Sequence, residues 1–375
     1  MKKFFAIFSS MLIIFFIINF ILAFTLSPIN KFIITNILNK PIYKDESLKA
    51  LGIDRSEERV FYNENWNRTF KYVQFAEHYE AETDKQKYVN VTKFDGRKME
   101  NNSNCEKNFY FYGSSLTFGY SAKDTQTIPS YFKEILDINY PKSNYCVFNF
   151  GSASYFSTQE NILFQTHILN NRIQENDFIF FIDGHSESGN QRSRVSKHLK
   201  KMFDGVNARM LAELKFSFSF FWNSLPTTKI YNFAKNLFKK ENTKNENTKK
   251  ENNSENMIKG VSKREIKEVF QKNILMRQAI CNDLKLNCYT FLQPFPNIHG
   301  FYSKKLSKEP QHKDPYLEKY DLLKDTKYIF DISNALDDNI INSSGDPYHY
   351  SPESNKSIAK SIYDIANNKI NEYRK

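Results

Sequence analysis

The sequence predicts an α/β fold in which helices cover both faces of a parallel sheet. From residue 109 onward, short and almost wholly apolar runs alternate with longer runs of helical periodicity. Apolar strands of this kind are typical of sheets that are buried on both sides. Glycines and polar residues follow several of these runs at their carboxyl ends, where the clefts of open α/β sheets lie. The chain has 375 residues, enough for one large or two smaller domains.

Each element follows from its own pattern. The first strand, 109–112, is a run of Phe and Tyr that breaks at Gly113, and the strand at 178–182 is wholly apolar. The helix at 128–136 is amphipathic. The other strands are expected at 145–150 and 287–292, and the other helices at 158–170, 266–284 and 351–373.

The amino-terminal segment Phe4–Leu26, after Lys2 and Lys3, carries no charge and is overwhelmingly Phe, Ile and Leu. About 20 apolar residues span the hydrocarbon core of a bilayer. Only Ala23 is small near the end of the run, which favours an uncleaved anchor over a cleaved signal peptide. We therefore expect residues 1–26 to be a single-pass transmembrane signal anchor in a bacterial inner (cytoplasmic) membrane, with the remainder on the extracytoplasmic, periplasmic side.

Three further regions are expected. Residues 27–105 form a small β-rich extension, because 61–94 is rich in Tyr, Phe, Val and Thr with turn-like breaks. Residues 106–375 form the main domain. Its alternation stops at about 189–260, where we expect a helical insertion and a disordered low-complexity loop of Lys, Asn, Glu and Thr. The aromatic run 216–222 is interpreted as a packed helix, with a hydrophobic lid or a membrane contact as the alternative.

Composition limits the partners. The net charge is +11, but the Lys residues are scattered among Asn and Glu, so no nucleic-acid partner is expected. The four cysteines, Cys105, Cys146, Cys281 and Cys288, form no C-x-x-C pair, which leaves zinc and redox motifs unsupported. Disulfides Cys105–Cys146 or Cys281–Cys288 are compatible with export, and the pairing stays open. No metal or cofactor is implied, and the oligomeric state is open.

A serine, a histidine and an acid stand at informative places. Ser115 follows the first strand, and Asp346 and His349 lie three residues apart just before the last helix. A serine becomes a nucleophile when a histidine takes its proton and an acid orients that histidine. Gly151 ends the second strand and residues 183–187 end the third, so these segments share one edge of a parallel sheet.

Here the chain resembles the SGNH/GDSL hydrolase superfamily, whose fold is a three-layer, flavodoxin-like α/β/α domain and whose members hydrolyse esters. Residues 113–119 resemble the first block of that family, with Ser115 at the nucleophile. Gly151 matches the oxyanion-hole glycine of the second block. Asp346 and His349, followed by 351–355, closely match the last block, in which the acid orients the histidine.

The chain departs from the family at two positions. Ser114 replaces the aspartate of the first block. In the third block, Ser186 stands where an oxyanion-hole asparagine belongs, within Gly184-His185-Ser186-Glu187. A serine hydroxyl donates one hydrogen bond on a shorter arm, and loss of one oxyanion donor costs roughly 10²–10³ in rate. His185 is the alternative donor, with a structural role as its other interpretation.

The resemblance and the anchor together lead us to expect an extracytoplasmic serine esterase that removes O-acetyl or other short acyl esters from a glycan. The expected catalytic residues are Ser115, His349 and Asp346. The oxyanion hole is expected from the backbone N–H groups of Ser115 and Gly151, with help from Ser186. An O-acetyltransferase using the same residues, a lipid esterase, and a catalytically weakened glycan-binding or assembly module are the alternatives.

Overall fold

The computed structural model divides the chain into two compact units, 1–41 with 192–260 and 42–191 with 261–375. The structure describes these residues: 10, 11, 13–21, 41–184, 186, 187, 222, 225–228, 263–295, 320–336 and 349–372. Each unit is described by itself. The second unit carries the sheet and every described residue of the predicted site.

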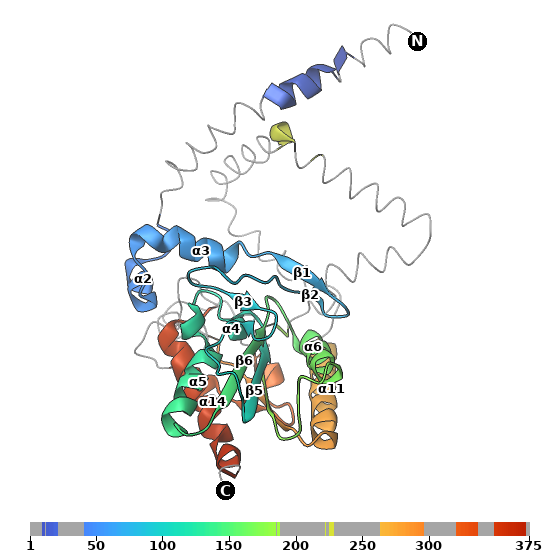
Figure 1. The fold of residues 1–375 in the computed structure, drawn as a ribbon. Coiled ribbons are helices and arrows are strands. Elements are labelled where there is room, and N and C mark those ends of the chain that lie inside the picture. The colour runs from blue at the N-terminus through green and yellow to red at the C-terminus, as the bar shows by residue number, and fades with distance from the viewer. Residues whose placement is uncertain are drawn as a thin grey trace, which may run out of the picture. The chain divides into compact units, whose positions relative to one another are not determined.

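The second unit is built on a seven-stranded sheet in the order β3-β4-β6-β5-β7-β8-β9 (Figure 1). The pairs from β4 to β9 are parallel, and only β3 and β4 pair antiparallel. The predicted α/β fold with a mostly parallel sheet is thus confirmed. The strands are β3 (Val91–Thr92), β4 (Gly96–Arg97), β5 (Lys107–Gly113), β6 (Tyr145–Gly151), β7 (Phe178–Asp183), β8 (Asn287–Leu292) and β9 (Phe330–Asp331).

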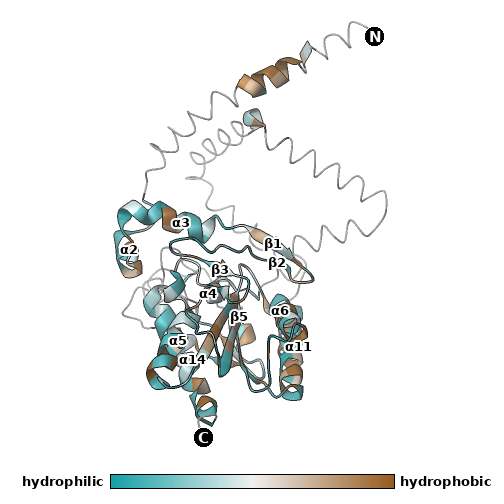
Figure 2. Cartoon of the chain, in the orientation of Figure 1, coloured by the Kyte–Doolittle hydropathy of each residue, from teal (hydrophilic) through white to brown (hydrophobic). Residues whose placement is uncertain are grey.

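Helices cover both faces of this sheet (Figure 1). Helices α5 (Ile128–Asn139) and α14 (Pro352–Glu372) share a core with Phe109 and Phe111, whereas α6 (Ser157–Leu169) and α11 (Lys263–Asp283) share the opposite core with Tyr110 and Tyr112. Successive residues of a strand point to opposite faces, so both sets must be apolar. Figure 2 shows hydrophobic residues along the central strand β5 and a mixture of hydrophilic and hydrophobic residues along the helices.

Local sequence signals fix where the helices begin. At α5 the hydroxyl of Thr127 accepts a hydrogen bond from the backbone N–H of Ser130 (3.2 Å), and Pro129 lies in the first turn. At α14 the hydroxyl of Ser351 accepts from the N–H of Ser354 (3.2 Å) in the same way. The second cap fixes the start of α14 at Pro352, three residues after His349.

The amino-terminal extension differs from the β-rich segment that the composition predicts. It contains two helices, α2 (Asp45–Leu51) and α3 (Glu58–Trp66), a short 3₁₀ turn at Arg55–Glu57, and a hairpin of β1 (Phe70–Val73) and β2 (Glu77–Glu80). The buried residues of α3 are Glu58, Phe61 and Asn65, spaced three and four apart, which is a helical face. This periodicity prevails over the strand preference of the aromatic residues. In addition, β3 and β4 belong to the central sheet itself.

Within the first unit, two contacts join the amino-terminal segment to the insertion. Asn19 Oδ1 accepts hydrogen bonds from the backbone N–H and the hydroxyl of Thr227 (3.2 and 2.8 Å), and the ring of Phe15 stacks on Trp222. Among the residues that the structure describes, no helix combines the length and apolar character needed to cross a bilayer. The structure does not describe residues 1–9, 12 and 22–26 of the predicted anchor. The run 216–221 and the low-complexity loop of the insertion also lie outside the described residues.

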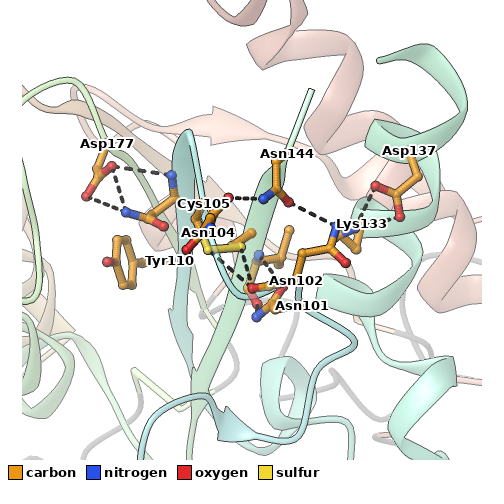
Figure 3. The surroundings of a disulfide bond; sticks show 12 residues. Asn101, Asn102, Asn104, Cys105, Tyr110, Lys133, Asp137, Asn144 and Asp177 are labelled. Atoms are coloured by element: carbon orange, nitrogen blue, oxygen red, sulfur yellow. Dashed lines mark hydrogen bonds and ion pairs between the residues drawn. A yellow bond between two sulfur atoms is a disulfide. The ribbon is translucent and has the colours of Figure 1, made fainter. Parts of the chain in front are cut away.

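Two disulfides are formed, Cys105–Cys146 and Cys281–Cys288. The first ties the segment before β5 to the start of β6 (Figure 3). Beside it, the amide of Asn101 donates to the carbonyl of Val147 (2.7 Å) and accepts from its N–H (2.9 Å), which extends the edge of β6. Both pairings that the sequence left open are therefore present.

The two disulfides are expected to differ in their effect on stability. The first closes a loop with a sequence separation of 41 residues and the second a loop of 7. Because a cross-link restricts the unfolded chain more when its loop is longer, Cys105→Ser with Cys146→Ser should lower the free energy of unfolding by about 4 kcal/mol, and Cys281→Ser with Cys288→Ser by about 2 kcal/mol. Urea unfolding of the two double variants measures this, and the reverse order would contradict it.

Candidate active site

The serine segment is shaped by glycines at both of its ends. Strand β5 ends at Gly113, where an added Cβ would lie 2.0 Å from Thr117 Oγ1, and the short helix α4 (Ser115–Phe118) follows at once. The helix ends at Gly119, whose φ of 86° is in the left-handed region. The chain therefore turns sharply at the carboxyl end of β5 and presents Ser115 there as the first residue of α4.

The structure brings His349 to this serine. His349 Nε2 lies 3.1 Å from Ser115 Oγ, across 234 residues of sequence. The next residue, Tyr350, is buried, and its hydroxyl donates to the carbonyl of Pro294, which holds the backbone beside the imidazole. The distance is within the range for a hydrogen bond between a nucleophile and its general base. Asp346 and His185 lie outside the described residues, so the acid and the alternative donor stay predictions.

The neighbouring Ser114 faces a different partner. Its side chain is 2% exposed and caps α4, accepting a long hydrogen bond (3.5 Å) from the N–H of Leu116. It is thus turned to the start of its own helix. Of the two adjacent serines, it is Ser115 that stands beside His349.

Gly151 has a packing role in addition to its predicted one. A Cβ on Gly151 would lie 2.2 Å from the backbone nitrogen of Phe118, so only glycine lets α4 approach β6 this closely. Its N–H donates to Asn149 Oδ1 (3.1 Å), and the amide of Asn149 in turn donates to the carbonyl of Thr117 (3.0 Å). The N–H that the sequence predicts as an oxyanion donor is therefore already bonded here.

The segment after β7 is held by Glu187. Its carboxylate accepts hydrogen bonds from the backbone N–H and, at 2.9 Å, the hydroxyl of Ser157, the first residue of α6. Gly184 has a φ of 131°, a conformation that other residues rarely adopt. Ser186 lies half-buried between these two fixed points.

Two aromatic residues that sequence reasoning missed border His349. The ring centroid of Trp66, from α3, lies 5.0 Å from that of the imidazole at an interplanar angle of 84°, and the ring of Tyr120 lies 5.9 Å away. Trp66 and Tyr120 also contact one another, with centroids 5.3 Å apart. No pattern in the sequence pairs an extension residue with the histidine before the last helix, because the contact depends on the tertiary fold alone.

A buried charge cluster supports the same edge of the sheet. The guanidinium of Arg277, from α11, pairs with Asp183 and with Glu160 (2.9 Å), and all three side chains are at most 1% exposed. It also stacks over the ring of Phe181, 3.8 Å from its centroid. Sequence reasoning missed this cluster, although one signal was present: Arg277 falls on the buried stripe of α11 among Phe270, Ile274 and Cys281.

Burial and the charge of Asp183 shift the pKa values of two carboxyl groups here, those of Glu187 and Glu160. Burial, together with the nearby charge of Asp183, raises the pKa of Glu187 to about 7 and raises the pKa of Glu160 well above its ordinary value. A carboxyl whose pKa is raised on folding stabilises the fold fully below its unfolded pKa, and that contribution is lost as the pH rises through the folded pKa.

We therefore expect the Glu187 contribution to fall as the pH rises from about 4.5 to about 7. The free energy of unfolding of the wild type relative to Glu187→Gln should decrease across this range, since the amide does not titrate. Glu175→Gln, in an exposed pair with Lys285, is the matched control for the loss of one surface carboxylate. Urea unfolding at several pH values makes the comparison. A difference that rises with pH would contradict it.

Comparison with known proteins gives similarity at the level of structure. The sequence matches no protein-family model, and no curated protein matches it. Similar solved structures include an acetyl xylan esterase from Geobacillus stearothermophilus (11% identity, covering 69% of this chain and 94% of that chain, TM-score 0.36). They also include a putative lipolytic protein of the G-D-S-L family from Desulfitobacterium hafniense (13%, 69% and 99%, TM-score 0.35). A third is an α/β hydrolase enzyme from the metagenome of Lake Arreo, Spain (11%, 70% and 95%, TM-score 0.39). The functional argument rests on the geometry of the site.

Proposed function

We propose that this protein is an extracytoplasmic serine esterase that removes O-acetyl or other short acyl esters from a glycan. The observation that carries the proposal is the 3.1 Å approach of His349 Nε2 to Ser115 Oγ at the carboxyl edge of the sheet. A serine and a histidine at this distance form the nucleophile and base of acyl transfer. The glycan and the acetyl group come from the family resemblance and the expected location.

The reaction divides into two steps. His349 takes the proton of Ser115 as the serine oxygen bonds to the carbonyl carbon of the ester, and then gives that proton to the leaving alcohol. The acyl group remains on Ser115. A water molecule, deprotonated by His349, then attacks the acyl carbon and releases the carboxylic acid, which restores the serine. In this scheme Asp346 orients the imidazole.

The negative charge that develops on the carbonyl oxygen needs hydrogen-bond donors. Ser115 is the first residue of α4, and the first N–H groups of a helix have no partner within it. The hydroxyl of Ser186 is the second proposed donor. For Gly151 to take part, its N–H must exchange the bond to Asn149 Oδ1 for one to the substrate oxygen.

The proposed location outside the cytoplasm is supported by the two disulfides. Disulfides persist in oxidising compartments and are rare in the cytosol. Retention in the membrane by Phe4–Leu26 is part of the same proposal, and the protein should then fractionate with membranes with its amino terminus intact.

The function is tested by measuring acetate release from 4-nitrophenyl acetate and from an O-acetylated glycan by the purified full-length protein in detergent. The wild type should release acetate from both, and His349→Gln should release neither above the rate without protein. Transfer of the acetyl group to an added sugar without release of free acetate would favour the transferase. No turnover of either ester would contradict the proposal.

A further inference from the structure

Trp66 is held firmly beside the proposed catalytic histidine. Its indole Nε1–H donates to the hydroxyl of Tyr43 (3.0 Å), which fixes the ring's orientation. The preceding residue, Asn65, is buried and accepts a hydrogen bond from the backbone N–H of Ser121 (3.0 Å), just after α4. The end of α3 is therefore bonded to the same segment that carries Ser115, and the indole remains half-buried rather than enclosed.

The extension is tied to the site at a second point, Glu80 of β2. Its carboxylate is fully buried and accepts from the hydroxyl of Tyr120 (3.0 Å), from the N–H of Ala153 (3.2 Å) and from Arg68 Nε (3.0 Å). Hydrogen bonds to a buried, paired carboxylate are strong and directional. The segments after β5 and β6, which border the site, are thus held by a residue of the extension, so the extension forms one wall of the site.

The position of Trp66 identifies the part of the substrate that it meets. In the proposed reaction His349 delivers a proton to the leaving alcohol, so the alcohol oxygen must come within hydrogen-bond distance of Nε2. The carbonyl oxygen lies instead toward the oxyanion donors after β5 and β7. An aromatic ring in contact with the imidazole therefore borders the alcohol side of the ester rather than the acyl side.

We propose that Trp66 forms a subsite for the alcohol part of the ester and that this alcohol is a sugar ring, an inference that rests on the proposed function of Ser115 and His349. An indole supplies a large, rigid apolar surface with little loss of conformational freedom on binding. A sugar ring presents a face of C–H groups that packs on such a surface while its hydroxyls stay in water. Trp66 then selects esters of sugars over esters of small acyclic alcohols.

The first test uses tryptophan fluorescence, because Trp66 and Trp222 are the two tryptophans of the chain. The full-length protein with Trp222→Phe has Trp66 as its only tryptophan, and Ser115→Ala added to it stops turnover. Titration with methyl 6-O-acetyl-glucoside should shift or quench the emission with saturation, whereas ethyl acetate at the same concentration should leave it unchanged. Equal responses to both esters, or none to the sugar ester, would overturn the proposal.

The second test measures selectivity. Trp66→Leu should lower the ratio of kcat/KM for the acetylated glucoside to kcat/KM for ethyl acetate at least about tenfold. Trp66→Phe keeps an aromatic ring, so its selectivity for the acetylated glucoside over ethyl acetate should lie between that of the wild type and that of Trp66→Leu. A matching fall for both esters would mean that Trp66 only positions His349 and would sink the sugar subsite.

The two proposals fail separately. If the wild type hydrolyses both esters and Trp66→Leu leaves their ratio unchanged, the esterase stands and the subsite falls. If the wild type hydrolyses neither ester while the Trp66 emission still saturates with the acetylated glucoside alone, the subsite stands and the esterase falls.

Discussion

Replacing Ser115 with alanine is expected to lower kcat for ester hydrolysis by at least about 10³-fold, because removal of a nucleophile leaves only the binding and oxyanion contributions. The hydroxyl of Ser115 is the one that lies 3.1 Å from His349 Nε2. Steady-state kinetics with 4-nitrophenyl acetate measure the loss, and circular dichroism confirms that the variant is folded.

The adjacent serine provides the matched control. Ser114→Ala removes a hydroxyl that accepts a 3.5 Å capping bond from the N–H of Leu116, so most of the activity should remain. A large loss in Ser114→Ala together with an active Ser115→Ala would show that the nucleophile has been assigned to the wrong residue.

The largest expected effect on stability is at Arg277. Arg277→Met should lower the free energy of unfolding by about 3–5 kcal/mol, because it removes the cation between Asp183 and Glu160 and leaves two carboxyls buried without it. Methionine preserves much of the volume over Phe181, so the loss reports on the charge rather than on a cavity. Urea unfolding at neutral pH measures it.

Lys285→Met is the control for this variant. Lys285 pairs with Glu175 at 3.1 Å, but the two side chains are 72% and 57% exposed, and a pair of that kind contributes at most about 1 kcal/mol. Equal losses in the two variants would show that burial does not decide the role of Arg277. A more stable Arg277→Met would show that the cluster can be replaced by apolar packing, as happens for some buried ion pairs.

The sequence predicts the central sheet well because its signals there are local. Strand β8 has the predicted bounds, 287–292, strands β6 and β7 are one residue longer at their carboxyl ends, and helix α6 is shifted by one residue. Strand β9 was missed because a two-residue edge strand carries no periodicity. Much of helix α3 lies in the stretch that was interpreted as β-rich because aromatic residues favour strands, whereas the spacing of its buried residues is helical.

The site shows the same division between local and tertiary information. Motif resemblance indicates Ser115 and His349, and the fold brings their side chains within 3.1 Å. The sequence does not reveal that Asn149 engages the N–H of Gly151, or that Trp66 lies against His349, since both depend on how separate elements pack. The sequence analysis did not single out Arg277, because only its buried neighbours distinguish it from a surface arginine.

The central claim is that His349 activates Ser115 as a nucleophile, and covalent labelling tests it most directly. A fluorophosphonate forms a bond from phosphorus to an activated serine oxygen and releases fluoride, and peptide mass spectrometry locates the modified residue. The account predicts one labelled serine, Ser115, in the wild type, no label in Ser115→Ala, and labelling at least about tenfold slower in His349→Ala. A label on another serine, or labelling of Ser115 at the same rate without His349, would contradict it.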